Sequence, residues 1–291
     1  MKSGTSNNTL RTALLGQRCI SPASVYDALS ARVAEAAGCE IGMLAGSIAS
    51  AVVIGAPDLV VLTLTELAGE VRRITRASNL ALMVDADHGF GNALNVMRSV
   101  QELEHAGAAG LSIEDTQLPT PYGTSAPTYL GIPEMQGKLR AAAEARSNPD
   151  FVIAGRTGAL KSETLQSVVE RVAAYSDTGV DAIFLVGVSR LEELRAFQAV
   201  TKLPLILGNS PESFATPEGR KELEQRGVRM LLQGHQPLLA ALKALRDAYG
   251  HLQAGGSAAE LKSRIVSSAD LEALLQDDRY KELRAKYLRQ A

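Results

Sequence analysis

Short apolar segments alternate with amphipathic helical patterns along most of the chain. Eight apolar runs have the length and hydrophobicity of buried parallel strands: residues 19–25, 41–45, 81–85, 110–114, 151–155, 182–186, 204–207 and 230–233. Helical patterns between them begin near Ser30, Thr65, Asn92, Pro133, Ser162, Arg190, Thr216 and Pro237. Eight alternations within about 250 residues predict a (β/α)8 barrel, also called a TIM barrel. A doubly wound open sheet is the alternative, but no G-x-G-x-x-G pattern follows the first strand.

Helical segments extend this repeat at both ends. Residues 9–15 are typical of a short helix that ends at Gly16. A polar linker at 253–257 precedes two helical patterns with apolar stripes, at 268–275 and 279–288. We predict a barrel with its N-terminal helix over 1–250, and a linker and C-terminal helical extension over 251–291 within the same structural unit. An amphipathic extension without its own core must pack on its own barrel or on a neighbour's, so we expect a homo-oligomer, a dimer or a tetramer.

The composition of the 291-residue chain, with 46% hydrophobic residues, is typical of a soluble globular protein. A net charge of -2 and a pI near 6.1 give no electrostatic signal for nucleic acid or membrane surfaces. No signal-peptide core and no run of roughly 20 apolar residues is present, so we expect a cytoplasmic protein. Cys19 and Cys39 lack metal-binding spacing and are predicted to be buried free thiols.

Two carboxylates stand on alternate residues where the third apolar run ends. Asp85 and Asp87 precede a Gly-x-Gly turn, and alternate strand residues point to the same face. Two carboxylates held this close repel unless a cation or a proton lies between them, and oxygen ligands suit Mg²⁺, with Mn²⁺ also possible. The alternative is a strand end closed by an Asp-rich turn.

Other strand ends carry polar groups that would share one rim of the barrel, where barrel enzymes place their active sites. Glu114 would join Asp85 and Asp87 as a metal ligand, directly or through water. A 2-oxo acid would suit such a metal, because its carboxylate and keto oxygens form a bidentate chelate. Arg156 could pair with a substrate carboxylate or with an enolate oxygen. A salt bridge between Arg156 and a neighbouring Asp is the alternative.

Two further groups at this rim could bind a developing negative charge. A small turn that contains Ser47 and Ile48 could offer backbone N–H donors as an oxyanion hole, although such a turn can also be only a turn. His235 could hydrogen-bond an enolate or ketone oxygen and take part in proton transfer. A buried core histidine is the alternative for His235.

The longest irregular segment within the barrel runs from Thr116 to Ile132 and is rich in Pro, Gly, Ser and Thr. Loops of this length in compact domains are commonly lids or binding loops. A surface excursion without a role is the alternative.

Several of these motifs together resemble the phosphoenolpyruvate mutase/isocitrate lyase superfamily. They are Asp85-Ala86-Asp87 followed by Gly89, Gly91 and Asn92, then Ile113-Glu114-Asp115, and Arg156-Thr157. The resemblance implies a Mg²⁺-dependent barrel that acts on 2-oxo acids, commonly a tetramer whose C-terminal helix is exchanged between subunits. It also maps the metal carboxylates of the family onto Asp85, Asp87 and Glu114.

Within the superfamily, the chain is most similar to the oxaloacetate decarboxylase branch. Its shared segments are Gly46-Ser47-x-Ala49-Ser50, the run from Asp85 to Arg98, Leu185-Val186-Gly187-Val188 and Gly234-His235. In that branch the residues matching Ser47, Arg156 and His235 bind substrate, and the residue matching Asp85 serves the metal. One departure stands out, because relatives usually follow the Arg-Thr pair with Asp or Asn, whereas this chain has Gly158.

The lid segment separates the branches further. Isocitrate and methylisocitrate lyases carry a catalytic Cys in a Lys-Lys-Cys-Gly-His-type loop, but the segment from Thr116 to Ile132 contains no Cys, His or Lys. It also contains no Arg or Asn that could hold a phosphonate. A lyase of that kind and a phosphoryl substrate are therefore both disfavoured.

The resulting hypothesis is Mg²⁺-dependent decarboxylation of oxaloacetate to pyruvate and CO2 through a metal-stabilised enolate, by a lyase with a small 2-oxo dicarboxylate as its substrate. One rival is another superfamily enzyme that cleaves a C–C or P–C bond, methylisocitrate lyase-like or phosphonopyruvate-processing. The other is a non-catalytic barrel that only binds a metal and a dicarboxylate.

Overall fold

The computed structural model describes residues 3–288, and within them one sheet of eight parallel strands follows chain order. The strands are β1 Ala23–Ser24, β2 Ile41–Leu44, β3 Ala81–Asp85, β4 Gly110–Glu114, β5 Val152–Thr157, β6 Ala182–Val186, β7 Leu205–Gly208 and β8 Val228–Leu231. Ile20 joins the two ends of the sheet through a parallel bridge to Met230. Main-chain bonds from Ile20 N to Arg229 O, 3.0 Å, and from Leu231 N to Ile20 O, 2.9 Å, hold this bridge. The sheet therefore closes, and the predicted barrel is confirmed.

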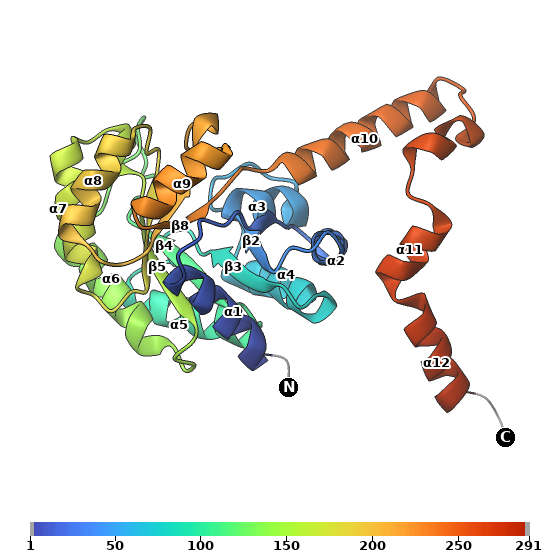
Figure 1. Cartoon of the computed structure of the whole chain (residues 1–291), viewed down its shortest axis with the longest axis horizontal. Helices are drawn as coiled ribbons and strands as arrows, with labels where there is room; N and C mark the ends of the chain where they lie inside the picture. Colours follow the sequence, from blue (N-terminus) through green and yellow to red (C-terminus); the bar gives the residue numbers. More distant parts are fainter. Residues whose placement is uncertain (1–2, 289–291) are drawn as a thin grey trace. The chain divides into compact units, whose positions relative to one another are not determined.

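Helices surround the strands on the outside of this barrel (Figure 1). They are α2 Ala28–Ala36, α3 Gly46–Ile54, α4 Leu64–Ala77, α5 Ala93–His105, α6 Ile132–Ala145, α7 Leu165–Ser176, α8 Leu191–Val200 and α9 Pro217–Gln225. Short 3-10 turns, η1 Ala159–Lys161 and η2 Glu212–Ala215, follow β5 and β7. Several helices begin at side-chain caps, as at Thr63, whose side chain accepts a bond from Glu66 N.

The prediction of local structure was wrong in one place that matters for the site. The segment expected to be a small turn around Ser47 is the first turn of α3. Helix α3 is apolar and rich in β-branched residues, so it lacks the periodic polar face that marks a surface helix.

Side chains that face the barrel interior follow the two-residue period of each strand. Met83 on β3 and Ala154 on β5 belong to the interior cluster and are fully buried. The next residues with the same orientation are Asp85 and Arg156. The strand register therefore directs both charged side chains toward the mouth of the barrel.

Helix α1, Ser3–Leu15, covers the opposite end of the barrel. Its Leu10 and Leu14 pack into the interior cluster. Arg11 donates to the Asp181 carboxylate at 2.8 Å, and Asp181 directly precedes β6. The N-terminal ends of the strands are thus closed by a helix, which leaves the C-terminal ends for the site.

The residues from Gln236 onward form a second compact unit. It contains α10 Gln236–Gln253, η3 Ala258–Arg264, α11 Ser268–Leu275 and α12 Asp277–Tyr287. Many of its large apolar side chains are exposed within this chain, among them Leu239, Leu242, Leu245, Tyr249, Leu271, Tyr280 and Tyr287. The expected division at residue 250 and the single structural unit stay predictions. Within residues 3–288, no helix has both the length and the apolarity required to cross a membrane.

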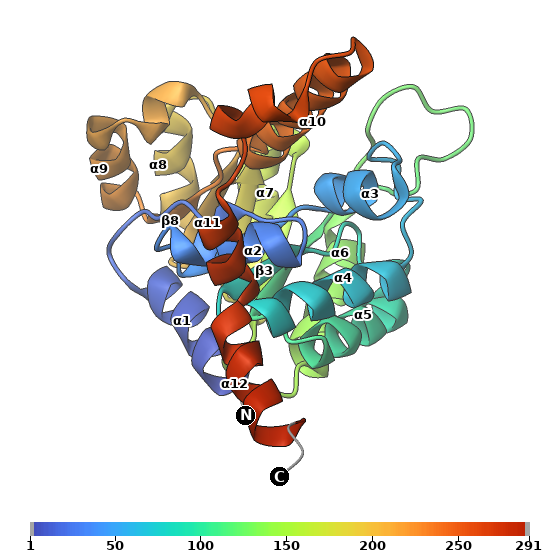
Figure 2. The same cartoon turned by 90° about the vertical axis from the view of Figure 1, so that its right-hand side faces the viewer.

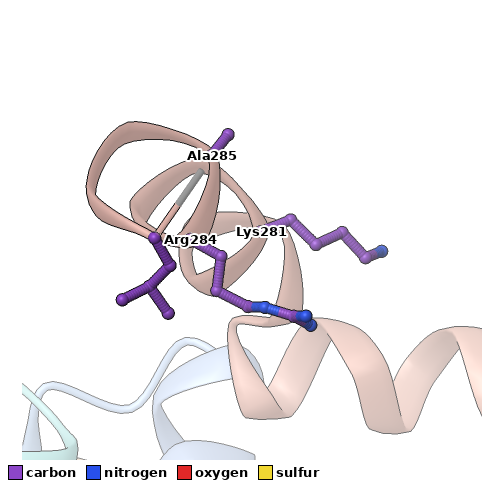
Figure 3. Close-up of a pocket in the computed structure, with 4 residues that line it drawn as sticks. Lys281, Arg284 and Ala285 are labelled. Carbon is purple, nitrogen blue, oxygen red and sulfur yellow. The ribbon is translucent and has the colours of Figure 1, made fainter. Parts of the chain in front are cut away.

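A pocket of about 290 Å³ lies on α12, lined by Lys281, Arg284, Ala285 and Leu288 (Figure 3). The Lys281 and Arg284 side chains extend away from the helix in this view. Lys281 also pairs with Asp277 at 3.0 Å and with Asp278 at 3.1 Å. None of the candidate site residues lines this pocket, so it is a surface feature of one helix.

The ion-pair cluster around Asp181 generates a prediction about stability. The Asp181 carboxylate accepts bonds from Arg11, from Arg146 at 2.6 Å and from Ile153 N at 2.9 Å. Asp181→Ala leaves these donors without their acceptor in a mostly buried place, and we expect the free energy of unfolding to fall by about 3 kcal/mol. The more exposed Asp150, 3.8 Å from Arg11, is the control, and Asp150→Ala should cost less than about 1 kcal/mol. Denaturant unfolding measures both, and equal losses would contradict this account.

Candidate active site

Asp85, Glu114 and Arg156 meet at the C-terminal end of the barrel. Asp85 ends β3 and Glu114 ends β4, and Glu114 lies directly opposite Arg156 in the pairing of β4 with β5. Arg156 pairs through Nη1 with Asp85 Oδ2, and its Nη2 lies 3.1 Å from Glu114 Oε2. Two nearly buried carboxylates thus share one guanidinium.

The Arg156 guanidinium lies over the aromatic ring of Phe184. Its guanidinium carbon lies 5.1 Å from the centroid of Phe184 on β6, which is a favourable cation–π distance. Burial alone would lower the pKa of Arg156, but Asp85 and Glu114 outweigh it and raise the pKa, so the group stays charged. The buried Nε has no hydrogen-bond partner among residues 3–288. Arg156 therefore keeps one donor for a further acceptor.

The N-terminus of α3 lies beside Asp87. A side chain at Gly46 would place its Cβ 2.4 Å from Asp87 Oδ1, so only glycine allows this close approach. The cap residue Ala45 makes no side-chain hydrogen bond to the helix, and the first N–H groups of a helix have no intrahelical acceptor. The N–H groups of Ser47 and Ile48 are therefore positioned to bind an anion at this rim.

Asp87 has an unusual backbone conformation and a raised pKa. Its φ of 46° lies in the left-handed region, which is sparsely populated by residues other than glycine and is often found at functional sites. Its N–H donates to Asp85 Oδ1 at 3.3 Å. Burial and the charges of Asp85, Glu114 and Asp58 raise the pKa of Asp87 to about 8, against the opposing effect of Arg156. Burial also raises the pKa of Glu114.

His235 lies on the same rim, after β8. Its Nε2 is 3.4 Å from Ser47 Oγ, and its Nδ1 is 3.5 Å from Ser24 Oγ. Burial lowers the pKa of His235, and the charges of Asp58 and Asp85 oppose this effect. The imidazole is therefore neutral near pH 7 and presents one N–H donor. The structure thus brings together all the sequence-predicted site residues: Ser47, Ile48, Asp85, Asp87, Glu114, Arg156 and His235.

Asp58 is a member of this cluster that the sequence did not reveal. It lies on the loop between α3 and α4, at the solvent side of the site. Partial burial and the charge of Asp85 raise its pKa, while Arg156 and His235 lower it. Because α3 was expected to be a turn, the residues after it could not be assigned to the rim. Phe184 was missed for a different reason, since its apolar strand carries no sign of a charged neighbour.

The long loop after β4 has an ordered base. Thr116 and Tyr129 form an antiparallel bridge, and Gln117 N donates to Thr128 O at 2.8 Å. Leu130 N donates to Asp115 O, also at 2.8 Å, whereas Tyr122 farther along the loop is fully exposed. The loop projects from the barrel as the green segment in Figure 2. A lid function for it stays a prediction.

The donor set at the rim suits a hard divalent cation. Asp58, Asp85, Asp87 and Glu114 supply more negative charge than Arg156 can balance, and this excess adds to the effect of burial in raising the pKa of Asp87. Within residues 3–288, no three His, Cys, Asp or Glu side chains already surround a common metal position, since Arg156 stands between Asp85 and Glu114. Mg²⁺ in proteins usually keeps several waters and takes only one or two carboxylates. The residues present therefore fit Mg²⁺ bound largely through water.

Comparison with known proteins gives a consistent family assignment. The family model for phosphoenolpyruvate phosphomutase matches residues 12–253. The chain is 47% identical over 272 residues to a Bradyrhizobium diazoefficiens protein named oxaloacetate decarboxylase, covering 91% of this chain and 93% of that protein. A protein of the same name from Rhodopseudomonas palustris is 47% identical over 262 residues, with 90% of this chain and 89% of that protein covered.

Solved structures agree in fold across the whole chain. A phosphonopyruvate hydrolase solved in complex with oxalate and Mg²⁺ has a TM-score of 0.84 at 29% identity and covers 98% of this chain and 99% of its own. An oxaloacetate acetylhydrolase in complex with the inhibitor 3,3-difluorooxalacetate has a TM-score of 0.85 at 26% identity, with both chains covered at 100%. One of these neighbours thus holds Mg²⁺ and a small dicarboxylate.

The raised pKa of Asp87 predicts how stability depends on pH. The folded protein binds this proton more tightly than the unfolded chain, whose Asp residues titrate near pH 3.9. The contribution of Asp87 is therefore fully present below that pH and is lost as pH rises through about 8. We expect the Tm of metal-free protein to fall between about pH 5 and pH 8 and Asp87→Asn to flatten this decline.

Thermal unfolding at constant ionic strength measures this effect, with Asp150→Asn as the control. Asp150 lies at the other end of the barrel, beside Arg11, so its variant should keep the wild-type slope. A slope that is the same in wild type and Asp87→Asn would contradict the charge assignment.

Proposed function

The chain belongs to the phosphoenolpyruvate phosphomutase family, and on this basis we propose that it is a lyase that decarboxylates oxaloacetate to pyruvate and CO2. The relatives named oxaloacetate decarboxylase support this choice of reaction. The observation that carries the proposal is the contact of Arg156 with Asp85 and Glu114 at the barrel mouth. Beside it lie the α3 N-terminus and His235, so donors for an anion face a cluster that suits a cation.

Substrate binding uses the donors at this rim. A carboxylate of oxaloacetate pairs with Arg156, whose Nη1 and Nη2 contact Asp85 and Glu114 in the free protein and whose Nε has no partner among the described residues. The N–H groups of Ser47 and Ile48 donate to a second oxygen of the substrate, and the Ser47 hydroxyl stands next to His235. These contacts orient the bond between C3 and C4 for cleavage.

Bond cleavage moves an electron pair toward the ketone oxygen. The C3–C4 bond breaks, C4 leaves as CO2, and the pair forms the pyruvate enolate, which is then protonated at C3 to give pyruvate. Arg156, the α3 N–H groups and the N–H of neutral His235 are the donors that stabilise this oxyanion. Such pre-positioned donors are each worth roughly 2.7–4 kcal/mol in other enzymes.

A divalent cation completes the proposal. Asp85, Asp87 and Glu114 would hold Mg²⁺ or Mn²⁺, with Asp58 close by, and Arg156 would then be freed for the substrate. The bound ion would supply Lewis-acid polarisation of the carboxylate and ketone oxygens of a 2-oxo acid. Asp87 would have to lose its proton to act as a ligand, and burial together with the charges of Asp85, Glu114 and Asp58 raises its pKa.

A P–C bond-cleaving activity is the rival within the family, given the likeness to phosphonopyruvate hydrolase. The loop from Thr116 to Ile132 lacks Lys, Arg and Asn, so it brings no cationic side chain for a phosphonate, and the side chain of its one amide residue, Gln117, accepts a bond from Thr128 at the base of the loop. Turnover of phosphonopyruvate faster than oxaloacetate would favour this rival. Oxalate binding without any turnover would favour a non-catalytic barrel.

Loss of the His235 donor should slow the reaction. We expect His235→Ala to lower kcat for pyruvate formation by at least about tenfold, because one oxyanion donor is removed. EDTA should abolish the activity of the wild type, and Mg²⁺ should restore it. Pyruvate is measured by a coupled assay against the Mg²⁺-only background. Unchanged kcat in His235→Ala would remove His235 from the mechanism, and full activity in EDTA would remove the metal.

We also propose that the protein is a homo-oligomer, a dimer or tetramer, in which the second unit packs on a neighbouring subunit. The exposed apolar side chains of α10 and α12, such as Leu242, Leu245 and Tyr280, support this, since soluble proteins rarely leave extended apolar faces open. Exposed Leu29 and Val33 on α2 offer a similar face on the barrel unit. We also propose that the protein is cytoplasmic, as expected from its sequence.

Charge introduced into the apolar face should break the assembly. We expect the wild type to elute as a dimer or tetramer by light scattering, and Leu242→Asp to shift the mass toward the monomer. Lys243→Asp, one residue along α10 at an ion-paired surface position, is the control and should keep the wild-type mass. A monomeric wild type would rule the proposal out.

A further inference from the structure

Gly158 stands directly after β5, two residues beyond Arg156. Its backbone has φ -108° and ψ 10°, a conformation that residues with side chains also adopt. A Cβ at this position would meet one atom within 4 Å among the described residues, the Tyr129 hydroxyl oxygen at 3.7 Å. This is an ordinary van der Waals contact, so neither the backbone nor the packing requires glycine here.

Tyr129 contacts Gly158 from the long loop. It lies near the C-terminal end of the loop, and its hydroxyl donates to Gly158 O at 2.9 Å. The same carbonyl accepts from Lys161 N at 3.1 Å. The phenol therefore ties the returning end of the loop to the segment that follows the substrate-binding strand.

A buried arginine holds Tyr129 in place. The Arg171 guanidinium lies 5.7 Å from the centroid of the Tyr129 ring and donates to Leu130 O at 2.8 Å. Arg171 also pairs with Glu163 at 2.8 Å and with the fully buried Asp115 at 3.3 Å. The position of the Tyr129 hydroxyl is thus set by a network that reaches the residue next to Glu114.

Gly158 directly follows β5, which ends at Thr157, and its φ of -108° is close to that of a strand residue. A Cβ there would therefore project toward the same side as the side chain of Arg156, two positions earlier. That side is the mouth of the barrel, where Arg156 meets Asp85 and Glu114. The missing side chain therefore leaves open space beside Arg156, and the Tyr129 hydroxyl forms its boundary.

We propose that Gly158 and Tyr129 are a specificity-determining pair, which sets how large a substituent the 2-oxo diacid may carry at C3. This inference rests on the proposed function, because it specifies which substrates of that reaction fit. Gly158 provides the room, and Tyr129 is a positioning residue that limits it.

Two substitutions test the pair in opposite directions. Gly158→Ala adds one methyl group to the space, and we expect the preference for oxaloacetate over 3-methyloxaloacetate, as the ratio of kcat/KM values, to rise about tenfold. Its Tm should stay equal or rise, because alanine fits this backbone and restricts the unfolded chain. Tyr129→Phe keeps the ring over Arg171 but removes the hydroxyl, and should lower the ratio about threefold with Gly158 still present.

Gly137→Ala is the matched control, since Gly137 lies in α6 with nothing within 4 Å of its added Cβ. It should leave the ratio at the wild-type value. A role in stability alone would change Tm without moving the ratio, so ratios within twofold of wild type in both Gly158→Ala and Tyr129→Phe would overturn the inference.

Failure of the proposed function gives a different result. A wild type that does not turn over oxaloacetate with Mg²⁺ contradicts decarboxylation itself. The pair is then tested by calorimetry, with the ratio of the two dissociation constants in place of the kcat/KM ratio. The same shifts would support the pair as a determinant of binding, and unchanged ratios would overturn it.

Discussion

The balance between one buried guanidinium and a group of carboxylates governs the mouth of this barrel. Arg156 compensates part of the charge of Asp85 and Glu114, while burial and the remaining carboxylate charge raise the pKa of Asp87 to about 8. Buried charges without partners are costly, so a site built in this way favours a cation and the anionic substrate that comes with it. The excess of buried carboxylate charge, which is unfavourable in the free protein, thus favours binding of a cation.

The barrel delivers these groups because its strands keep a two-residue period up to their ends. Residues that fill the interior lower down, such as Met83 and Ala154, are followed in the same register by Asp85 and Arg156. Helix α1 closes the opposite end, and Gly46 lets the N-terminus of α3 approach Asp87. Rigid elements therefore supply most of the candidate site. The loop base at Tyr129 adds a boundary that the barrel alone does not have.

Local patterns predict the barrel well because each buried strand is a short apolar run with helical signals on both sides. The strands at 81–85, 110–114 and 182–186 have the same bounds in the sequence analysis and in the structure. Asp85 and Arg156 could be placed at one rim since that inference needs only strand ends and a closed sheet. Their direct contact is nonlocal, and the sequence offers a salt bridge only as the alternative for Arg156.

Features that depend on long-range packing were out of reach of the sequence. Helix α3 has no polar face, so its sequence predicts a turn and gives no sign that Asp58 beyond it reaches the rim. The hydrogen bond of Tyr129 to Gly158 joins residues far apart in the chain, and nothing near Gly158 signals that its missing side chain faces a phenol. The strained backbone of Asp87 is likewise visible only in three dimensions.

The most direct test of the central claim is a crystal structure of the protein with oxalate and Mn²⁺, with the metal located by its anomalous signal. The account predicts one strong peak beside Asp85, close to Asp87 and Glu114, with oxalate between the metal and Arg156. A peak at another place in the chain, or oxalate bound away from Arg156, would contradict it.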